Sequence, residues 1–190
     1  MKLKTITCWI VIVNVIMFVL TYIDPTYMYH HCKISGNTMN EPHRWITSMF
    51  MHGGFVHLLF NMVTLYGFSL IVERDFTKKG FLIIYFIGGL LATAAQLYTS
   101  DPSISLVGAS GAVCAVLAAF SFRYPKNKVL FFFVIPMEIK KLVFGVTFFS
   151  IFCHITGAIQ GLGHMAHAGG LIFGWVFAKY IYPNIKLSIR

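Results

Sequence analysis

Residues 142–178 read LVFGVTFFSIFCHITGAIQGLGHMAHAGGLIFGWVFA, a run of 37 residues without a charged side chain. As a single α-helix this run would be about 55 Å long, whereas the hydrocarbon core of a bilayer is about 30 Å thick. The run must therefore fold back on itself, and Gly157, Gly161 and Gly163 mark the turn. The stretch predicts two helices that cross a membrane in opposite directions.

The rest of the 190-residue chain has the same character, with 57% apolar and only 11% charged residues. A soluble domain is about half apolar and about a quarter charged, so these charges are too few to cover a water-exposed surface. The high hydrophobicity also excludes intrinsic disorder. The net charge of +9 lies in short clusters between apolar runs, which argues against a nucleic-acid partner and favours a polytopic membrane protein.

We expect an all-α bundle of six transmembrane helices that forms one membrane domain over residues 1–190. Stretches of about 20 residues that are poor in charge set the number of spans. The fourth of these stretches is short and begins with a glycine-rich segment. The expected spans are approximately 5–23, 55–72, 80–99, 107–122, 140–157 and 163–182.

The basic residues predict the orientation, because cytoplasmic loops carry an excess of Lys and Arg. Of the 15 basic residues, only Lys33 and Arg44 fall on one side of the expected membrane. Both termini are therefore expected to be cytoplasmic, and the long first loop, residues 24–54, to face outward. The basic residues on the cytoplasmic side are Lys2, Lys4, Arg74, Lys78, Lys79, Arg123, Lys126, Lys128, Lys140, Lys141, Lys179, Lys186 and Arg190.

Polar residues inside apolar spans are costly and therefore mark candidate functional sites. The first group is His52, His57 and Asn61 at the outer end of the second span. His57 and Asn61 are four residues apart and share a helix face, so they could aim hydrogen-bond donors at one point. The alternative is structural, with these side chains forming hydrogen bonds between helices.

The second group, Gly108-Ala109-Ser110-Gly111-Ala112, opens the fourth span. Such a small-residue segment usually serves close helix packing, and its Ser can bond back to its own helix. Glycines beside a Ser at a helix N-terminus also leave backbone N–H groups free next to the hydroxyl. The segment is therefore also a candidate oxyanion site.

The third group is Ala166-His167-Ala168-Gly169-Gly170, followed by Gly174. Gly170 and Gly174 form a face on which another helix can pack closely, one turn after His167. If that helix is the fourth span, His167 comes within hydrogen-bond reach of Ser110. A neutral imidazole can take the Ser proton and return it to a leaving amine. Because no carboxylate lies inside a span, the two residues would act as a Ser-His dyad.

Together and in this order, the three groups resemble the rhomboid family of intramembrane serine proteases. The resemblance covers residues 44–174 and implies a rhomboid-like helix bundle. It implies that Ser110 is the nucleophile and His167 the general base. It also implies an oxyanion hole formed by His57, Asn61 and the Ser110 backbone N–H. The supporting positions would be His52, Gly108, Gly111, Gly170 and Gly174, with Glu73-Arg74 in a structural role.

The resemblance further implies substrates that are single-span membrane proteins, cleaved within or near the bilayer. In the family, the fifth span and the loop before the sixth act as gate and cap. We expect no metal, no cofactor and no nucleic-acid partner, and membrane lipids as the surroundings. The expected location is the bacterial inner (plasma) membrane, because the chain is little more than the six-span body.

Two positions depart from the family pattern. The first loop commonly carries a Trp-Arg pair, whereas here His43 precedes Arg44 and the Trp follows as Trp45. Four residues after the nucleophile, Cys114 stands where some members carry a Tyr that stacks on the base. The smaller side chain is expected to leave His167 less constrained. Cys114 itself is not expected to be the nucleophile, since a buried apolar thiol is usually inert.

Other functions fit the sequence less well. A zinc protease needs His-Glu-x-x-His, which His164-x-x-His167 does not supply. An aspartyl protease needs two carboxylates in mid-span, whereas Asp75 and Asp101 are expected in loops. A transporter is disfavoured by the short, uncharged fourth span. The alternative that stays open is a non-catalytic rhomboid-like protein that binds transmembrane helices for quality control.

Overall fold

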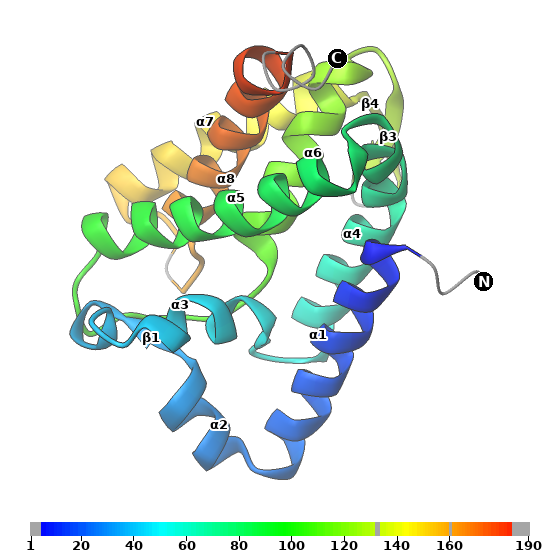
Figure 1. Cartoon of the computed structure of the whole chain (residues 1–190). Helices are drawn as coiled ribbons and strands as arrows, with labels where there is room; N and C mark the ends of the chain where they lie inside the picture. The colour runs from blue at the N-terminus through cyan, green and yellow to red at the C-terminus, as the bar shows by residue number, and fades with distance from the viewer. Residues whose placement is uncertain (1–4, 132–133, 160, 184–190) are drawn as a thin grey trace.

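The computed structural model describes residues 5–131, 134–159 and 161–183, and most of them are helical (Figure 1). Lys2, Lys4, Lys186 and Arg190, which contribute to the predicted charge asymmetry, lie outside the described residues. The helices are α1 (Ile6–Ile23), α2 (Pro25–Cys32), α3 (Pro42–Thr47), α4 (Phe55–Asp75), α5 (Thr77–Thr99), α6 (Ser110–Arg123), α7 (Ile139–Thr156) and α8 (His164–Val176). The strands are β1 (Ile34–Ser35), β2 (Ser105–Leu106), β3 (Lys128–Phe131) and β4 (Ile135–Glu138).

Each of the six apolar stretches contains a helix. Among the described residues, α1, α4, α5 and α7 are long and apolar enough to cross a membrane, by length and composition. α8 continues through a π-helical turn, Phe177–Ile181, that lengthens it. The first loop is not irregular, because it forms α2, β1, α3 and two short 3₁₀ turns, Gly36–Thr38 and Ser48–Phe50. The predicted spans therefore correspond to helices, and the first loop has more structure than the sequence indicated.

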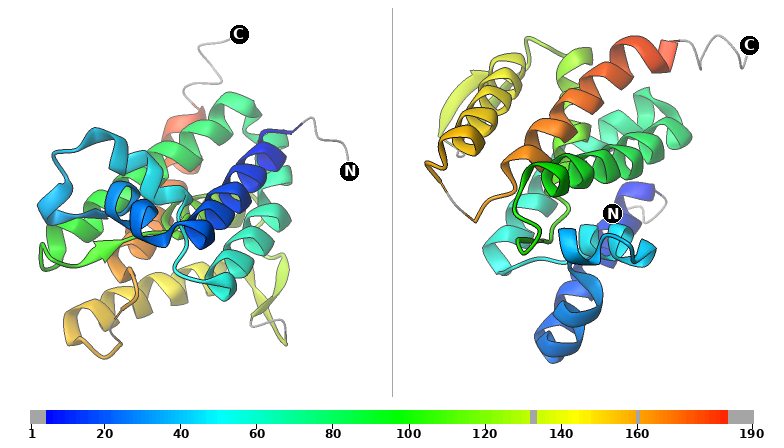
Figure 2. Two further views of the ribbon diagram at one scale, coloured as in Figure 1. Left: turned by 90° about the horizontal axis from the view of Figure 1, so that it is seen from below. Right: turned by 90° about the vertical axis from the view of Figure 1, so that its left-hand side faces the viewer.

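Helix α6 lies in the middle of the bundle, packed against α4, α5, α7 and α8 (Figures 1 and 2). It has 14 residues and is therefore about 21 Å long, shorter than a hydrocarbon core of about 30 Å. Small side chains fill most of its surface, and Ala115, Ala118 and Ala119 are completely buried. α6 is thus shorter than α4, α5 and α7, which pack around it.

Two glycines of α8 bring it into backbone contact with α6. A Cβ atom at Gly170 would overlap the carbonyl oxygen of Gly111, and one at Gly174 would overlap the carbonyl oxygen of Ala115. Only glycine leaves room for such an approach, as in other small-residue contacts between membrane helices. Gly170 and Gly174 thus set the distance between the two helices.

Three boundaries differ from the sequence prediction by three residues, and one of them is the start of α5, which begins at Thr77 and not at residue 80. The expected fourth span starts at residue 107, but α6 begins at Ser110, because Ser105–Leu106 pairs with the first loop as strand β2. Gly108 then turns the chain with a φ of 128°, a conformation that other residues rarely adopt. Asp75 is the last residue of α4 and not part of a loop, since the helix runs three residues beyond the expected end of the span.

Arg44 holds the first loop together. Its side chain is buried and donates hydrogen bonds to the carbonyl oxygens of His30 at 2.6 Å and Lys33 at 3.1 Å. Its Nε lies 2.9 Å from Glu41 Oε2, and this contact keeps the pKa of the Glu41 carboxyl below its usual value. The neighbouring Trp45 donates its indole N–H to Met39 O at 2.8 Å. The exchanged order of His43, Arg44 and Trp45 therefore still provides an anchor for this loop.

Glu73 joins the C-terminal end of α4 to the start of α1. Its buried carboxylate accepts hydrogen bonds from Ile6 N at 3.0 Å, Thr7 N at 3.1 Å and Thr7 Oγ1 at 3.0 Å. A carboxylate at a helix N-terminus satisfies free N–H groups and complements the helix dipole. Glu73 therefore caps a helix from a distance of 66 positions along the chain, which agrees with the structural role expected for it.

Replacing Glu73 with Ala should destabilise the protein, because the N–H groups of Ile6 and Thr7 would lose their acceptor in a buried place. We expect a loss of about 1 to 3 kcal/mol in the free energy of unfolding. Glu73→Gln keeps one acceptor oxygen and should lose less. Unfolding of the purified protein in mixed micelles measures both values. Equal stability of Glu73→Ala and the unchanged protein would contradict this capping role.

Candidate active site

Ser110 and His167 meet where α6 and α8 begin. Ser110 is the first residue of α6, and His167 lies in the first turn of α8. The distance between Ser110 Oγ and His167 Nε2 is 3.0 Å, within hydrogen-bond reach. Both side chains are half-buried, so they are neither sealed in the bundle nor fully exposed. The Ser hydroxyl is thus paired with an imidazole from another helix.

Gln96 of α5 fixes the N-terminus of the helix that carries His167. Its buried Oε1 accepts hydrogen bonds from Met165 N at 2.9 Å and Ala166 N at 3.2 Å. Its Nε2 donates to Ser100 Oγ at 2.6 Å. The N-cap of α8 is Gly163, which has no side chain for this task, so a residue 70 positions away supplies the cap. Gln96 was not among the predicted site residues, although a polar side chain inside an apolar stretch is a usable signal.

The N-terminus of α6, next to Ser110, has no side-chain cap. Its N-cap residue is Ala109, whose methyl group cannot accept a hydrogen bond from the first helical N–H groups. The preceding segment is held by the first loop, since Gly108 N donates to Ser48 O at 2.9 Å and Leu106 pairs with Ile34. The first loop therefore positions the segment that carries Ser110 while leaving the start of the helix uncapped by a side chain.

His57 lies against the backbone of Gly108. A Cβ atom at Gly108 would stand 2.7 Å from the imidazole carbon Cε1 of His57 and 2.9 Å from its Nε2, so only glycine fits beneath the ring. The other ring nitrogen, Nδ1, accepts a hydrogen bond from Gly53 N at 3.4 Å. This bond places the proton of a neutral His57 on Nε2. His57 therefore presents a donor beside the Gly108-Ser110 segment.

Asn61 and His52 complete the first predicted group. Asn61 is buried, and its Nδ2 donates to His57 O at 2.9 Å within its own helix. His52 is also buried and packs edge-on to His57 with ring centroids 5.0 Å apart. Burial lowers the pKa of His52 to about 4, so its ring is neutral at pH 7. The structure thus brings His57 to the Ser110 segment. Asn61 and His52 contact His57, the first at its backbone carbonyl and the second at its ring.

The remaining candidate groups lie around this pair. Cys114 follows Ser110 by one helical turn, and its Cβ faces Gly170 across the contact between α6 and α8. His164 is buried, and its Nε2 bonds to the carbonyl oxygen of Ile159 at 2.9 Å. Within the described part of the chain, no group of three His, Cys, Asp or Glu side chains is placed to hold a metal ion.

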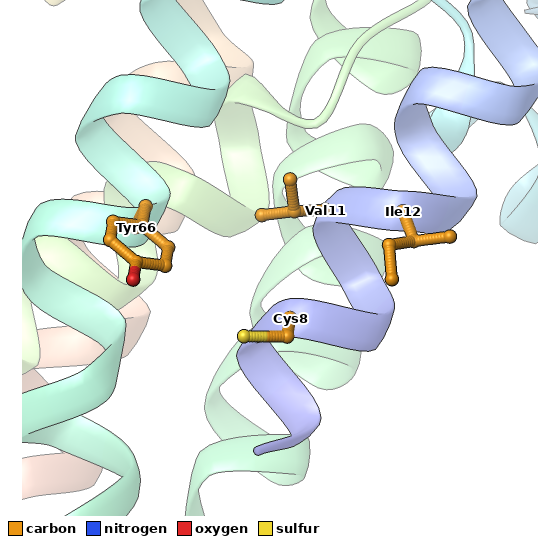
Figure 3. Close-up of a pocket in the computed structure, with 4 residues that line it drawn as sticks. All are labelled: Cys8, Val11, Ile12 and Tyr66. Carbon is orange, nitrogen blue, oxygen red and sulfur yellow. The ribbon is translucent and has the colours of Figure 1, made fainter. Parts of the chain in front are cut away.

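A cavity of about 230 Å³ lies elsewhere, between α1 and α4 (Figure 3). Cys8, Val11 and Ile12 from α1 and Tyr66 from α4 line it. None of these residues belongs to the three polar groups. The Ser110 and His167 pair, and not this cavity, is the candidate centre of chemistry.

These features define a class: a helical membrane protein with a Ser-His pair at the N-termini of two closely packed helices. The Rhomboid domain model matches residues 39–184, which include Ser110, His167 and the His57 and Asn61 side chains. The chain therefore belongs to the rhomboid family and is an integral membrane protein.

Relatives carry the same family name. YdcA, a rhomboid protein of Bacillus subtilis, is 29% identical over 135 residues, which are 71% of this chain and 65% of YdcA. Rhomboid protease GluP of B. subtilis is 29% identical over 136 residues, 71% of this chain and 25% of GluP. Presenilin-associated rhomboid-like protein A, mitochondrial, of Danio rerio is 28% identical over 145 residues, 67% of this chain and 38% of the relative. The matched regions thus cover less than two thirds of these relatives' lengths.

Proposed function

We propose that this protein is an intramembrane serine endopeptidase that cleaves transmembrane segments of single-span membrane proteins. The observation that carries the proposal is the 3.0 Å contact between Ser110 Oγ and His167 Nε2. Membership of the rhomboid family and a relative named as a rhomboid protease support it. A non-catalytic member would not need a Ser and a His held together by two separate helices and by the Gln96 cap.

In the proposed reaction, the Ser110 hydroxyl gives its proton to His167 Nε2 as Oγ attacks the scissile carbonyl carbon. The resulting tetrahedral intermediate carries a negative oxygen. It collapses when His167 returns the proton to the leaving amine, which breaks the C–N bond and leaves an acyl-enzyme on Ser110. Water, activated by the same imidazole, then hydrolyses the ester. A dyad suffices because Gln96 fixes the helix that orients His167.

The negative oxygen needs hydrogen-bond donors placed in advance. The uncapped N-terminus of α6 offers the backbone N–H of Ser110, and His57 offers Nε2–H beside Gly108. Asn61 lies one turn after His57, with its amide donating to His57 O in the resting protein. We assign all three donors to the oxyanion hole, with the Asn61 side chain rotating toward the substrate oxygen when it arrives.

Asn61→Ala should slow turnover without abolishing it, because two oxyanion donors stay in place. The expected loss of transition-state stabilisation is about 1 to 3 kcal/mol, which is at or slightly below the cost of removing one oxyanion donor. Initial rates of reporter cleavage, measured over a series of substrate concentrations in liposomes, give kcat and KM separately. The effect should fall on kcat. A rate equal to that of the unchanged protein would remove Asn61 from the hole.

We further propose that α1, α4, α5, α6, α7 and α8 are the six spans of one membrane domain, with both termini in the cytoplasm. Arg74 and Arg123 at the ends of α4 and α6, and Lys179 in the π-helical turn after α8, support this orientation. The lysines around β3 and β4 support it as well. The first loop with α2 and α3 would then face outward, on the side from which water reaches Ser110. Bacterial relatives support a bacterial inner membrane, although mitochondrial relatives also match.

The proposal is tested with purified protein reconstituted together with single-span reporter substrates. Mass spectrometry of the products should show cleavage within or near the transmembrane segment. The most readily cut substrates should have a small residue before the scissile bond and a helix-destabilising segment after it, as the family resemblance implies. Binding of the same substrates without any product would favour the non-catalytic alternative.

A further inference from the structure

The hairpin between α6 and α7 is a feature that the proposed reaction does not use. Its strands pair from Lys128↔Glu138 to Phe131↔Ile135. Backbone hydrogen bonds close its base, where Ile139 N donates to Asn127 O at 2.8 Å and Lys140 N to Pro125 O at 3.3 Å. It lies at the periphery of the bundle, next to the start of α7 (Figure 2).

Beyond Lys128, the exposed side chains that the structure describes in this hairpin are apolar. Val134 is 76% exposed, Leu130 59% and Ile135 52%. Pro136, the cross-strand partner of Leu130, is exposed as well. Val129 and Met137 are half-buried and pair with each other. A strand pair that turns apolar side chains outward at its far end suits an apolar medium better than water.

The base of the hairpin is basic. Lys126, Lys128, Lys140 and Lys141 surround it, and the acidic side chain in this segment is Glu138. The side chains of Lys141 and Glu138 form an exposed ion pair of 3.4 Å. The base of the hairpin therefore carries three more ammonium groups than carboxylates. Such a cluster next to a membrane span attracts anionic lipid phosphates.

Helix α7 indicates where the base of the hairpin lies relative to the lipid headgroups. Lys140 Nζ lies 5.9 Å above the ring centroid of Phe144, one turn further along the helix. From Phe144 onward most exposed side chains of α7 are large and apolar, with Phe144 53% and Phe148 75% exposed. The headgroup level therefore lies near Lys140 and Lys141, where the hairpin is attached. The hairpin begins and ends at this level, so its apolar side chains lie close to the boundary between headgroups and acyl chains.

We propose that the β3–β4 hairpin is a membrane-interface anchor. Leu130, Val134 and Ile135 enter the boundary between headgroups and acyl chains, and the lysines at the base bind phosphates of anionic phospholipids. The inference rests on the proposed membrane-spanning role of α7. It does not rest on catalysis by Ser110, so an inactive protein would serve equally well to test it.

The insertion is measured with a spin label at Val134→Cys in a variant whose four native cysteines are replaced. The protein is reconstituted in vesicles of phosphatidylcholine and phosphatidylglycerol, and collision rates with oxygen and with a water-soluble nickel chelate are compared. Phe148→Cys gives the lipid-facing reference and Ser103→Cys the aqueous one. We expect the label at 134, and a second label at Ile135→Cys, to favour oxygen several-fold over the Ser103 reference. Labels at 134 and 135 that match the Ser103 reference would overturn the anchor.

The role of charge is tested in the same assay with Lys126→Gln/Lys128→Gln. Lys78→Gln/Lys79→Gln is the matched control, since it removes the same charge from exposed positions at the start of α5. The first pair should make the label at 134 more accessible to the nickel chelate in vesicles with phosphatidylglycerol and leave it unchanged in phosphatidylcholine alone. The control pair should have no effect in either lipid. Equal results for the two pairs would contradict recognition of anionic lipid by the hairpin base.

Discussion

Ser110→Ala is expected to abolish cleavage of single-span reporter substrates by the reconstituted protein. The Ser110 hydroxyl is hydrogen-bonded to His167 Nε2 at 3.0 Å, and the substitution removes this hydroxyl. Without a nucleophile, no acyl-enzyme forms, and substrate binding and the remaining oxyanion donors contribute little by themselves. The rate should fall by at least about 10³-fold. Quantified product formation over several hours measures such a loss.

Ser121→Ala is the matched control, because it makes the same chemical change on the same helix. The Ser121 side chain is buried and donates to Ala118 O at 2.8 Å, so its hydroxyl serves its own helix. Activity should stay within a few-fold of that of the unchanged protein. Normal cleavage by Ser110→Ala would disprove the nucleophile assignment, whereas equal losses in both variants would show that the change acts through folding.

Gly174→Ala is expected to have the largest effect on the fold. Its new Cβ would overlap the backbone carbonyl of Ala115, and a backbone atom cannot rotate away as a side chain can. Overpacking of this kind costs about 1 to 3 kcal/mol or more, because α6 and α8 must separate. The separation also moves His167 from Ser110, and a shift of about 1 Å can cost about 10²-fold in rate. The free energy of unfolding, measured in mixed micelles, and the cleavage rate should therefore both decrease.

Gly145→Ala provides the comparison for this substitution. Gly145 lies within α7, where an added Cβ would meet no atom within 4 Å. Ala is the better helix former, by about 0.5 to 1 kcal/mol, so this variant should be as stable as the unchanged protein or more stable. Equal stability and equal activity of Gly174→Ala and Gly145→Ala would contradict the requirement for glycine at the α6–α8 contact.

Most of the fold could be predicted from the distribution of charge. The charge-free run of residues 142–178 predicted a helix pair, and the structure has α7 and α8 there. The start of α6 could not be placed, because strand β2 exists only by pairing with residues 34–35 of the first loop. The same holds for Arg44, whose partners are loop carbonyls. Local patterns indicate helices, but they do not indicate which distant backbone groups will be satisfied.

The residue types of the candidate site could be predicted from the sequence. The hydrogen bonds that hold these residues in place were harder to predict. Gly170 and Gly174 indicated a close helix contact that would bring His167 toward Ser110, and the two side chains lie at bonding distance. Gln96 was missed, because its partners are backbone groups that become available only when α5 and α8 pack together. The Asn61 amide also behaves differently from a free donor, since it bonds to its own helix. Such contacts depend on tertiary structure, so a single sequence contains little information about them.

Covalent labelling with a fluorescent fluorophosphonate tests the activation of Ser110 by His167 most directly, since it needs no knowledge of the substrate. We predict that the unchanged protein in detergent is labelled and that peptide mapping places the adduct on Ser110. Ser110→Ala and His167→Ala should remain unlabelled, while His154→Ala, the same change in α7, should be labelled normally. Equal labelling of His167→Ala and the unchanged protein, or an adduct on another residue such as Cys114, would contradict the Ser-His dyad.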